Sequence, residues 1–392
     1  MGLTDTQRDW LTLSMVPGVG TTLFIRLLAR FGAPRAVLSA SEAALAEVVG
    51  PKLAQRIRQY KTVVDVEAQE RRMAKYGAGL ITMDDPAYPP ALAEIYDPPL
   101  VLWTRGALLE QDAHAVAIVG TRRPTPYGLR MAESLARGLA ARGVAIVSGL
   151  AAGIDAAAHR GALEAGGRTL AVLGCGVDIV YPSENAELMH HVIQQGAVLS
   201  PYPMGVKPSK GRFPDRNRFI SGLSLGLIVV EAPPGSGALI TARNAAEQGR
   251  EVFAIPGHVG ERNSMGPHSL LREGARLAES ADDVLAELAL PVDIRQEAAE
   301  APPATTAPTQ ESAPPPAPER PQTAPETARA KPQPSLAGTE KDVLSVLSPD
   351  GSFVDEIAMA CRISVSEALS SLTMLELKGL VRQFSGKRFA PR

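Results

Sequence analysis

A basic stretch between Lys207 and Ser224 has the residue types best suited to binding an anion. Its first dozen residues contain one acid, Asp215, and five cations, which are Lys207, Lys210, Arg212, Arg216 and Arg218. Pro214 is typical of the first turn of a helix, so we expect Lys210, Arg212 and Phe213 to lie just before a helix N-terminus, whose free N–H groups favour an anion. Phosphate is the natural anion for this arrangement.

Two aromatic residues, Phe213 and to a lesser degree Phe219, are interspersed among these cations. Single-stranded nucleic acid is held by this combination, because cations contact the backbone phosphates while aromatic faces stack on bases. The alternative is a solvated basic loop with both phenylalanines in the core. The stretch alone does not decide between a nucleic-acid site and a packed loop.

The surrounding elements alternate between strand and helix. Apolar runs without polar alternation are typical of parallel strands that are covered on both faces. We expect strands at 79–83, 100–104, 115–119, 144–147, 169–173, 197–199, 227–230 and 252–255, and helices at 126–141, 154–165, 183–195, 214–223 and 238–248. This pattern predicts an α/β domain with an extended Rossmann-like, doubly wound sheet, which begins in earnest at residue 115.

Glycine-rich segments follow four of these strands, at 120–128, 148–155, 174–178 and 231–238. Ligands of a doubly wound sheet bind where the carboxyl ends of its strands meet the next helix N-termini. Arg122 follows the first of these parallel strands, and its planar guanidinium suits phosphate. Ser148 and Gly149 follow the next strand, and Gly237 lies in the last segment. Four such segments on one edge, facing the basic stretch, predict a phosphate-binding surface.

Composition and missing motifs exclude several classes of protein. The hydrophobic content of 45% and formal net charge of −2 describe a globular chain whose nucleic-acid site must be a local patch. Two cysteines, Cys175 and Cys361, favour a reducing cytoplasm over a disulfide framework. No apolar run approaches the ~18 residues of a membrane span. Metal-binding, Walker and dinucleotide signatures are missing, so we expect no metal, no cofactor and no catalytic residues.

The chain divides into four predicted segments. Residues 1–76 form a helical, SAM-like or helix-hairpin-helix domain in which Val16 to Gly20 make a turn that could hold a DNA phosphate. Residues 77–290 form the Rossmann-like DNA-binding domain. A Pro/Ala-rich tether spans 291–335. Residues 336–392 form a winged helix-turn-helix with helices at 339–347, 354–361 and 365–378 and a hairpin at 381–390.

A set of motifs resembles the DNA processing protein A (DprA/Smf) family. They are Ile118-Val119-Gly120-Thr121-Arg122, the segment from Ser148 to His159, Ala171 to Asp178, Tyr181-Pro182, Phe213-Pro214-Asp215-Arg216-Asn217-Arg218 and Ser236 to Ala242. The resemblance covers residues 80–290 and, in order, the helical and winged domains. It implies a cytoplasmic protein that binds incoming single-stranded DNA, forms a homodimer through the Rossmann-like domain and helps load the RecA recombinase during natural transformation.

The same resemblance implies which residues bind DNA. They are Arg122, Ser148, Gly149, Lys210, Phe213, Arg216, Asn217 and Arg218, and we add Gly237 from the last glycine-rich segment. An alternative is a nucleotide-processing enzyme of the phosphoribohydrolase type, which shares a related fold. Thr241 then stands where the catalytic glutamate of that family belongs, which leaves hydrolysis without an acid or base. A sequence-specific regulator is a third possibility, which the few basic residues of the third winged-domain helix disfavour.

Overall fold

The computed structural model describes residues 2–288, 338–348, 352–361, 363–378, 380–384 and 388–391. These residues fall into two compact units, one within 2–288 and one within 338–391. The predicted tether at 291–335 lies outside the described residues. No helix in the described part of the chain is long and apolar enough to cross a membrane.

The N-terminal part is helical, as predicted. Its helices are α1 (Asp5–Ser14), α2 (Thr21–Phe31), α3 (Pro34–Ser39), α4 (Glu42–Val49), α5 (Pro51–Arg58), α6 (Tyr60–Val63) and α7 (Val66–Tyr76). Thr4 starts α1 with a capping box to Gln7, which satisfies free N–H groups of the first turn. Trp10 and Phe24 pack with ring centroids 4.7 Å apart in its core. Gln69 of α7 bonds the backbone of Met204 in both directions, which ties the helical part to the sheet.

The sheet is larger than the sequence predicted. Its strands are β1 (Gly79–Thr82), β2 (Val101–Gly106), β3 (Ala115–Val119), β4 (Ala145–Ser148), β5 (Thr169–Val172), β6 (Ala197–Ser200), β7 (Gly226–Val229), β8 (Glu251–Ala254) and β9 (Arg276–Leu277). They run in the order β1-β2-β6-β5-β4-β3-β7-β8-β9. The pairs from β6 to β9 are parallel, whereas β1, β2 and β6 pair antiparallel. The proline-rich connector therefore extends the sheet, and the regular fold begins at Gly79.

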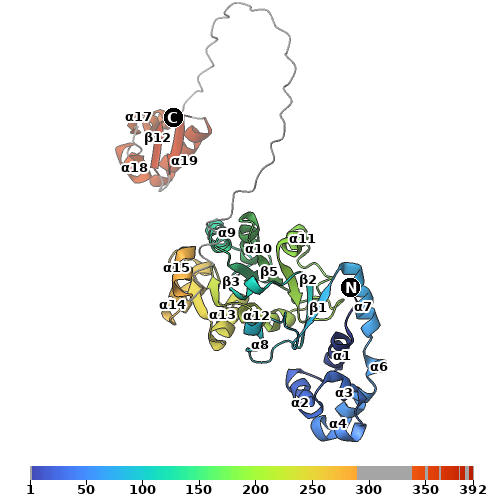
Figure 1. Cartoon of the computed structure of the whole chain (residues 1–392). Helices are drawn as coiled ribbons and strands as arrows, with labels where there is room; N and C mark the ends of the chain where they lie inside the picture. Colours follow the sequence, from blue (N-terminus) through green and yellow to red (C-terminus); the bar gives the residue numbers. More distant parts are fainter. Residues whose placement is uncertain are drawn as a thin grey trace, which may run out of the picture. The chain divides into compact units, whose positions relative to one another are not determined.

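Helices cover both faces of this sheet (Figure 1). On one face α9 (Pro126–Ala140), α10 (Ile154–Glu164) and α15 (Ala281–Glu287) bury apolar side chains such as Leu135 and Ile154. On the other face α8 (Pro90–Ala93), α12 (Arg212–Gly222) and α13 (Gly237–Glu247) bury Leu92 and Phe219 among others. Helices α11 (Ala186–Gln195) and α14 (Met265–Arg272) complete this part. The doubly wound fold is confirmed.

The second unit is a winged helix. It contains α17 (Gly338–Val346), β10 (Ser352–Phe353), α18 (Val354–Cys361), α19 (Val365–Leu377), β11 (Val381–Phe384) and β12 (Arg388–Pro391). The strand order is β10-β12-β11, so the predicted hairpin of β11 and β12 is joined by a short strand, β10, that was not predicted. Its core includes Val343, Ile357 and Leu372, which come from the three helices.

Candidate nucleic-acid interface

A cavity of about 750 Å³ opens at the carboxyl edge of the parallel strands. Within the sheet, β3 lies between β4, which follows it directly in the chain, and β7, which the chain forms later. The loops after β3 and β7 therefore diverge, and the space between them is the topological switch point where ligands of such sheets bind. Together with α12, these two loops line most of the cavity.

Six of the nine predicted DNA-binding residues meet in this cavity. They come from the loop after β3, from α12 with the residues just before it, and from the start of α13, and they are Arg122, Lys210, Phe213, Arg216, Asn217 and Gly237. Segments distant in sequence thus form one surface with a concentration of cations. Three further lining residues, which were not predicted from the sequence, could also contact a ligand: Arg123, Tyr181 and Arg262. Arg123 was signalled by its neighbour Arg122, whereas nothing in the sequence singled out Arg262.

The ring of Phe213 lies against Arg122 and Tyr181. The Cζ atom of Arg122 is 5.3 Å from the centroid of its ring, and the ring of Tyr181 is stacked against it with centroids 5.4 Å apart. The helix α12 begins at Arg212, with Gly211 before it, and not at Pro214 as predicted. Pro214 is the third helical residue and still lies in the first turn, where an N–H group is not required.

Arg216 is the charged floor of the cavity. Its side chain is on the inner face of α12, and the residue is only 4% exposed. One terminal guanidinium nitrogen, Nη1, donates to the carbonyl of Gly149 at 2.9 Å and also to the carbonyl of Val172. Its Nε has no hydrogen-bond partner in the described part of the chain. Burial lowers the pKa of Arg216, and the nearby carboxylate of Asp155 opposes that effect.

Asp155 supplies the counter-charge to Arg216. Its Oδ2 accepts hydrogen bonds from the backbone N–H groups of Gly149 at 3.2 Å and Ala151 at 3.4 Å. Burial raises the pKa of the Asp155 carboxyl group, whereas Arg216 and these two donors lower it. The loop after β4 is thereby folded around a buried pair of opposite charges.

Ser148 and Gly149 lie beneath the cavity and do not line it. The hydroxyl of Ser148 is fully buried and donates to the carbonyl of Ile118 at 2.6 Å, which links β4 to β3. A Cβ atom at Gly149 would lie 2.5 Å from Nη1 of Arg216 and 2.7 Å from Oδ2 of Asp155. Both residues therefore position the floor in this structure, which differs from the direct DNA contact that we expected of them.

Arg218 is directed away from the cavity, contrary to the expectation that it joins the same site. It donates to the backbone carbonyls of Tyr96 and Asp97 and forms an ion pair with the Asp97 carboxylate at 2.8 Å. Its Cζ atom lies 4.4 Å from the ring centroid of Phe219, which is buried in the core. Successive positions on a helix point in different directions, and positions 216 and 218 are about 200° apart.

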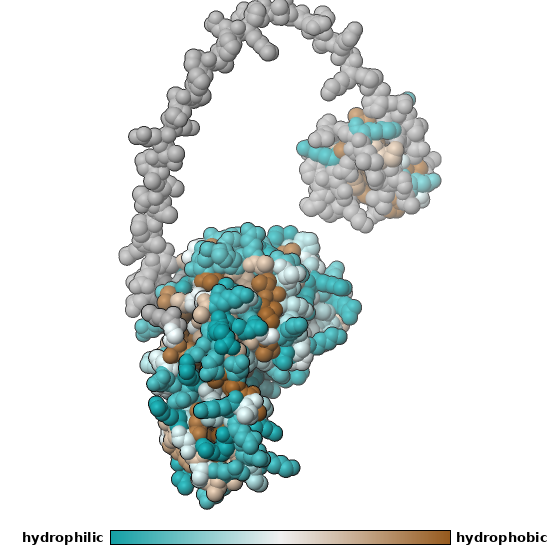
Figure 2. Space-filling model, turned by 90° about the vertical axis from the view of Figure 1, so that its right-hand side faces the viewer, coloured by the Kyte–Doolittle hydropathy of each residue, from teal (hydrophilic) through white to brown (hydrophobic). Residues whose placement is uncertain are grey.

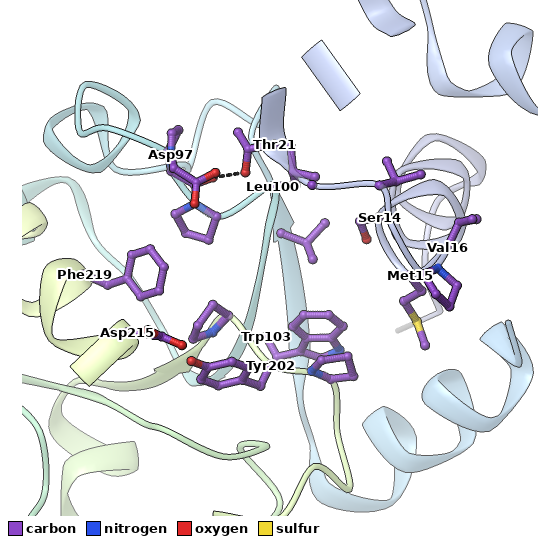
Figure 3. A pocket seen from close by; sticks show the side chains of 18 of the residues that line it. Ser14, Met15, Val16, Thr21, Asp97, Leu100, Trp103, Tyr202, Asp215 and Phe219 are labelled. Atoms are coloured by element: carbon purple, nitrogen blue, oxygen red, sulfur yellow. Dashed lines mark hydrogen bonds between the residues drawn. The ribbon is translucent and has the colours of Figure 1, made fainter. Parts of the chain in front are cut away.

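A second cavity, of about 860 Å³, lies between the helical part and the sheet (Figure 3). The predicted phosphate-binding turn from Val16 to Gly20 lines it, and the hydroxyl of Thr21 donates to the carbonyl of Pro98 at 3.0 Å across it. Two carboxylates, Asp97 and Asp215, also line it, and its cation Arg218 is already paired. This cavity therefore lacks the positive charge of the first one.

The fold and the first cavity define a class: a doubly wound α/β protein with a cationic, partly aromatic cavity at its switch point, preceded in the chain by a helical domain and followed by a winged-helix domain. Residues 79–289 match the family model of DNA recombination-mediator protein A, 297–387 that of the DprA winged helix domain, and 11–59 that of a SAM-like helix-hairpin-helix tandem. The chain belongs to the DNA processing protein A (DprA/Smf) family.

Individual relatives agree with this assignment. The chain is 37% identical to protein Smf of Synechocystis over 98% of its own length and 99% of that protein. It is 44% identical to DNA processing protein DprA of Bacillus subtilis over 54% of its length and 72% of the relative. The crystal structure of DprA from Streptococcus pneumoniae aligns with a TM-score of 0.65 and 36% identity, covering 74% of this chain and all of that one.

A structure of DNA processing protein A from Helicobacter pylori is also similar, with a TM-score of 0.50 and 33% identity over 54% of this chain and 96% of that one. The Helicobacter protein has a single-stranded DNA binding mode.

Proposed function

We propose that this chain binds single-stranded DNA in the switch-point cavity as a DNA-processing protein of natural transformation. Arg122 and Lys210 contact backbone phosphates, Phe213 contributes aromatic surface, and Arg216 with Asn217 and Gly237 forms the floor and far wall. Ser148, Gly149 and Arg218 serve this site indirectly, by holding the elements that carry it. Membership of the DNA-processing family and the single-stranded DNA binding mode of the Helicobacter relative support the choice of ligand.

One observation carries the proposal. Arg122, Lys210 and Arg216 line a single cavity whose only lining carboxylate in the described part of the chain is the buried Asp155. A cationic cavity beside stacked aromatic rings suits a polyanion with accessible bases more than it suits a duplex, whose bases are already stacked.

The test is fluorescence anisotropy with a labelled oligonucleotide, single-stranded against double-stranded, with and without ATP. We expect preference for the single strand and weaker binding by Lys210→Ala. Lys207→Ala is the matched control, because Lys207 is exposed on the same segment but does not line the cavity. Normal single-strand affinity in a folded Lys210→Ala protein would remove this segment from the site.

We propose that the cavity is not a hydrolase site. Thr241 lines it and donates its hydroxyl to the carbonyl of Gly237 at 3.2 Å, so no carboxylate stands where phosphoribohydrolases carry theirs. Asp155 is held by two backbone donors and faces Arg216, which suits a structural counter-ion. Release of free base from a nucleoside monophosphate by pure protein, abolished by Gly237→Asp, would overturn this part of the proposal.

Homodimer formation through the Rossmann-like domain, loading of RecA and a cytoplasmic location complete the proposal. Family membership supports RecA loading, and exposed apolar side chains support the dimer. Val259, Met265 and Leu277 are exposed near the β8–β9 side of the sheet. Figure 2 faces the opposite side of this unit, the side of α7 and α11, where other hydrophobic residues lie at the surface among hydrophilic ones. Sedimentation of wild type and Leu277→Glu tests the dimer. RecA filament assembly on strands coated with single-strand-binding protein tests the loading.

A further inference from the structure

The ring of Phe213 is already engaged by the protein. The Arg122 guanidinium lies over it and the Tyr181 ring is stacked against it. The backbone of Gly174 approaches its edge so closely that a Cβ atom there would lie 2.9 Å from Cδ1 of the ring. With three neighbours in contact, Phe213 is half-buried and has less free aromatic surface to offer an incoming base than the exposed Tyr181.

Tyr181 has more exposed aromatic surface than Phe213. It lines the same cavity and is 38% exposed, although its ring is stacked against Phe213 at an interplanar angle of 29°. It is the more exposed of the two aromatic residues that line this cavity in the described chain.

The segment that carries Tyr181 is held in place. Asn185, four residues later, donates from its side chain to the carbonyl of Leu150 at 2.9 Å and is itself buried. This bond ties the loop after β5 to the loop after β4, beneath which Asp155 and Arg216 lie. An aromatic ring on an anchored loop loses little conformational entropy when a ligand stacks on it, which favours binding.

We infer that Tyr181 forms a nucleobase subsite, with Phe213 as the layer behind it. This inference rests on the proposed binding of single-stranded DNA. A base stacks on the exposed surface of Tyr181, and Phe213 supports the Tyr181 ring from behind. Arg122, whose guanidinium also lies against Phe213, contacts a phosphate. Base–aromatic stacking is tolerant of sequence because every base has a π-face, so the subsite takes any unpaired base.

The competing explanation is that Tyr181 only shields Phe213 from water. The two explanations differ in one respect: a shielding residue affects all ligands equally, whereas a stacking residue affects only ligands that have bases. The experiment therefore compares a labelled oligothymidylate with an abasic oligonucleotide of the same length and phosphate number. Wild type, Tyr181→Ala, Tyr181→Phe and the control Tyr96→Ala are measured with both probes, and their melting temperatures are recorded. Tyr96 is 92% exposed and lines the other cavity.

We expect Tyr181→Ala to bind oligothymidylate about fivefold to a hundredfold more weakly, as for the loss of one stacked base. Its affinity for the abasic strand should equal that of wild type, and Tyr181→Phe should restore base binding. An equal loss on both probes, or unchanged binding to both, would overturn the subsite. If Lys210→Ala still weakens both probes in that case, the proposed DNA site stands without it; if wild type binds neither probe, the proposed function itself fails.

Discussion

The guanidinium of Arg216 donates to the carbonyl of Gly149 at 2.9 Å, which joins α12 to the loop after β4 under the floor of the cavity. Only glycine leaves room for this contact, because a Cβ atom at position 149 would lie 2.5 Å from Nη1 of Arg216. We expect Gly149→Ala to displace Arg216, lower the melting temperature and weaken single-strand binding. Thermal unfolding and anisotropy on the same preparation measure both effects.

Gly211→Ala is the matched control for that substitution. Gly211 directly precedes α12, and a Cβ atom there would meet nothing within 4 Å. The methyl group should leave stability and affinity unchanged within about 0.5 kcal/mol, the usual range for surface substitutions. A Gly149→Ala protein that behaves like Gly211→Ala would contradict the role assigned to this contact.

Charge and stacking should separate in salt titrations. Arg122→Ala removes one phosphate partner, so the slope of log affinity against log salt should fall by about 0.7. Phe213→Ala removes aromatic surface without charge, so affinity should drop while the slope hardly changes. Because Phe213 also packs against Arg122, Tyr181 and Gly174, its loss should lower stability as well, by up to about 3 kcal/mol. A Phe213→Ala protein with unchanged affinity and unchanged melting temperature would exclude both roles.

Arg218→Ala should affect folding more than DNA binding. Arg218 pairs with Asp97, whose φ of 55° is in the left-handed region that a non-glycine residue enters at a cost. Its bonds to the backbone of Tyr96 and Asp97 hold that turn, so its removal should reduce the free energy of unfolding by about 1 kcal/mol. Chemical denaturation measures this loss. A large decrease in single-strand affinity with unchanged stability would place Arg218 back in the DNA site.

The parallel sheet was predictable because its strands are continuous apolar runs bounded by glycine or proline. This pattern is typical of parallel strands that are covered on both faces. The switch-point cavity was partly predictable for the same reason: Arg122 and Lys210 follow strands, and strand ends converge at one edge. Strands β1 and β2 were correctly placed along the chain, yet their membership of the sheet depends on long-range pairing of β2 with β6.

Side-chain direction was the part that sequence could not supply. Arg216 and Arg218 are two residues apart with the same charge, and only the packing of α12 against the sheet decides that one faces the cavity and the other Asp97. Ser148 and Gly149 belong to a sequence motif of the family. A motif does not distinguish a residue that contacts DNA from one that positions the DNA-contacting residues. Tyr181 stacks on the ring of Phe213, which is 32 positions away in the sequence, so its placement in the cavity depends on long-range packing.

Deleting residues 336–392 should change single-strand affinity by less than about tenfold, or 1.4 kcal/mol. The N-terminus of α19 presents Glu367, which is hydrogen-bonded to both the backbone N–H and the hydroxyl of Ser364, and these bonds lower its pKa. An anionic carboxylate at that helix end disfavours phosphate. We therefore expect the winged helix to contact protein more than DNA. A loss greater than tenfold on the truncated protein, with the first unit still folded, would reject this assignment.

His159 should make stability sensitive to acid. Its ring is fully buried in α10, with Nδ1 2.7 Å from the hydroxyl of Thr169, and burial lowers its pKa to about 3. In the unfolded chain His159 binds a proton near pH 6.5, whereas in the folded chain it does not. The contribution of neutral His159 to the free energy of unfolding is therefore fully present above about pH 6.5 and is lost as pH falls toward 3. This one group contributes a slope of at most about 1.4 kcal/mol per pH unit in that window.

Urea denaturation of wild type and His159→Gln between pH 7 and pH 5 isolates the contribution of His159, because the two proteins share all other titrating groups. At pH 7 the His159→Gln protein should have a lower free energy of unfolding than wild type, and it should lose stability more slowly as the pH falls. Parallel plots of free energy against pH for the two proteins would show that His159 is not held neutral by burial.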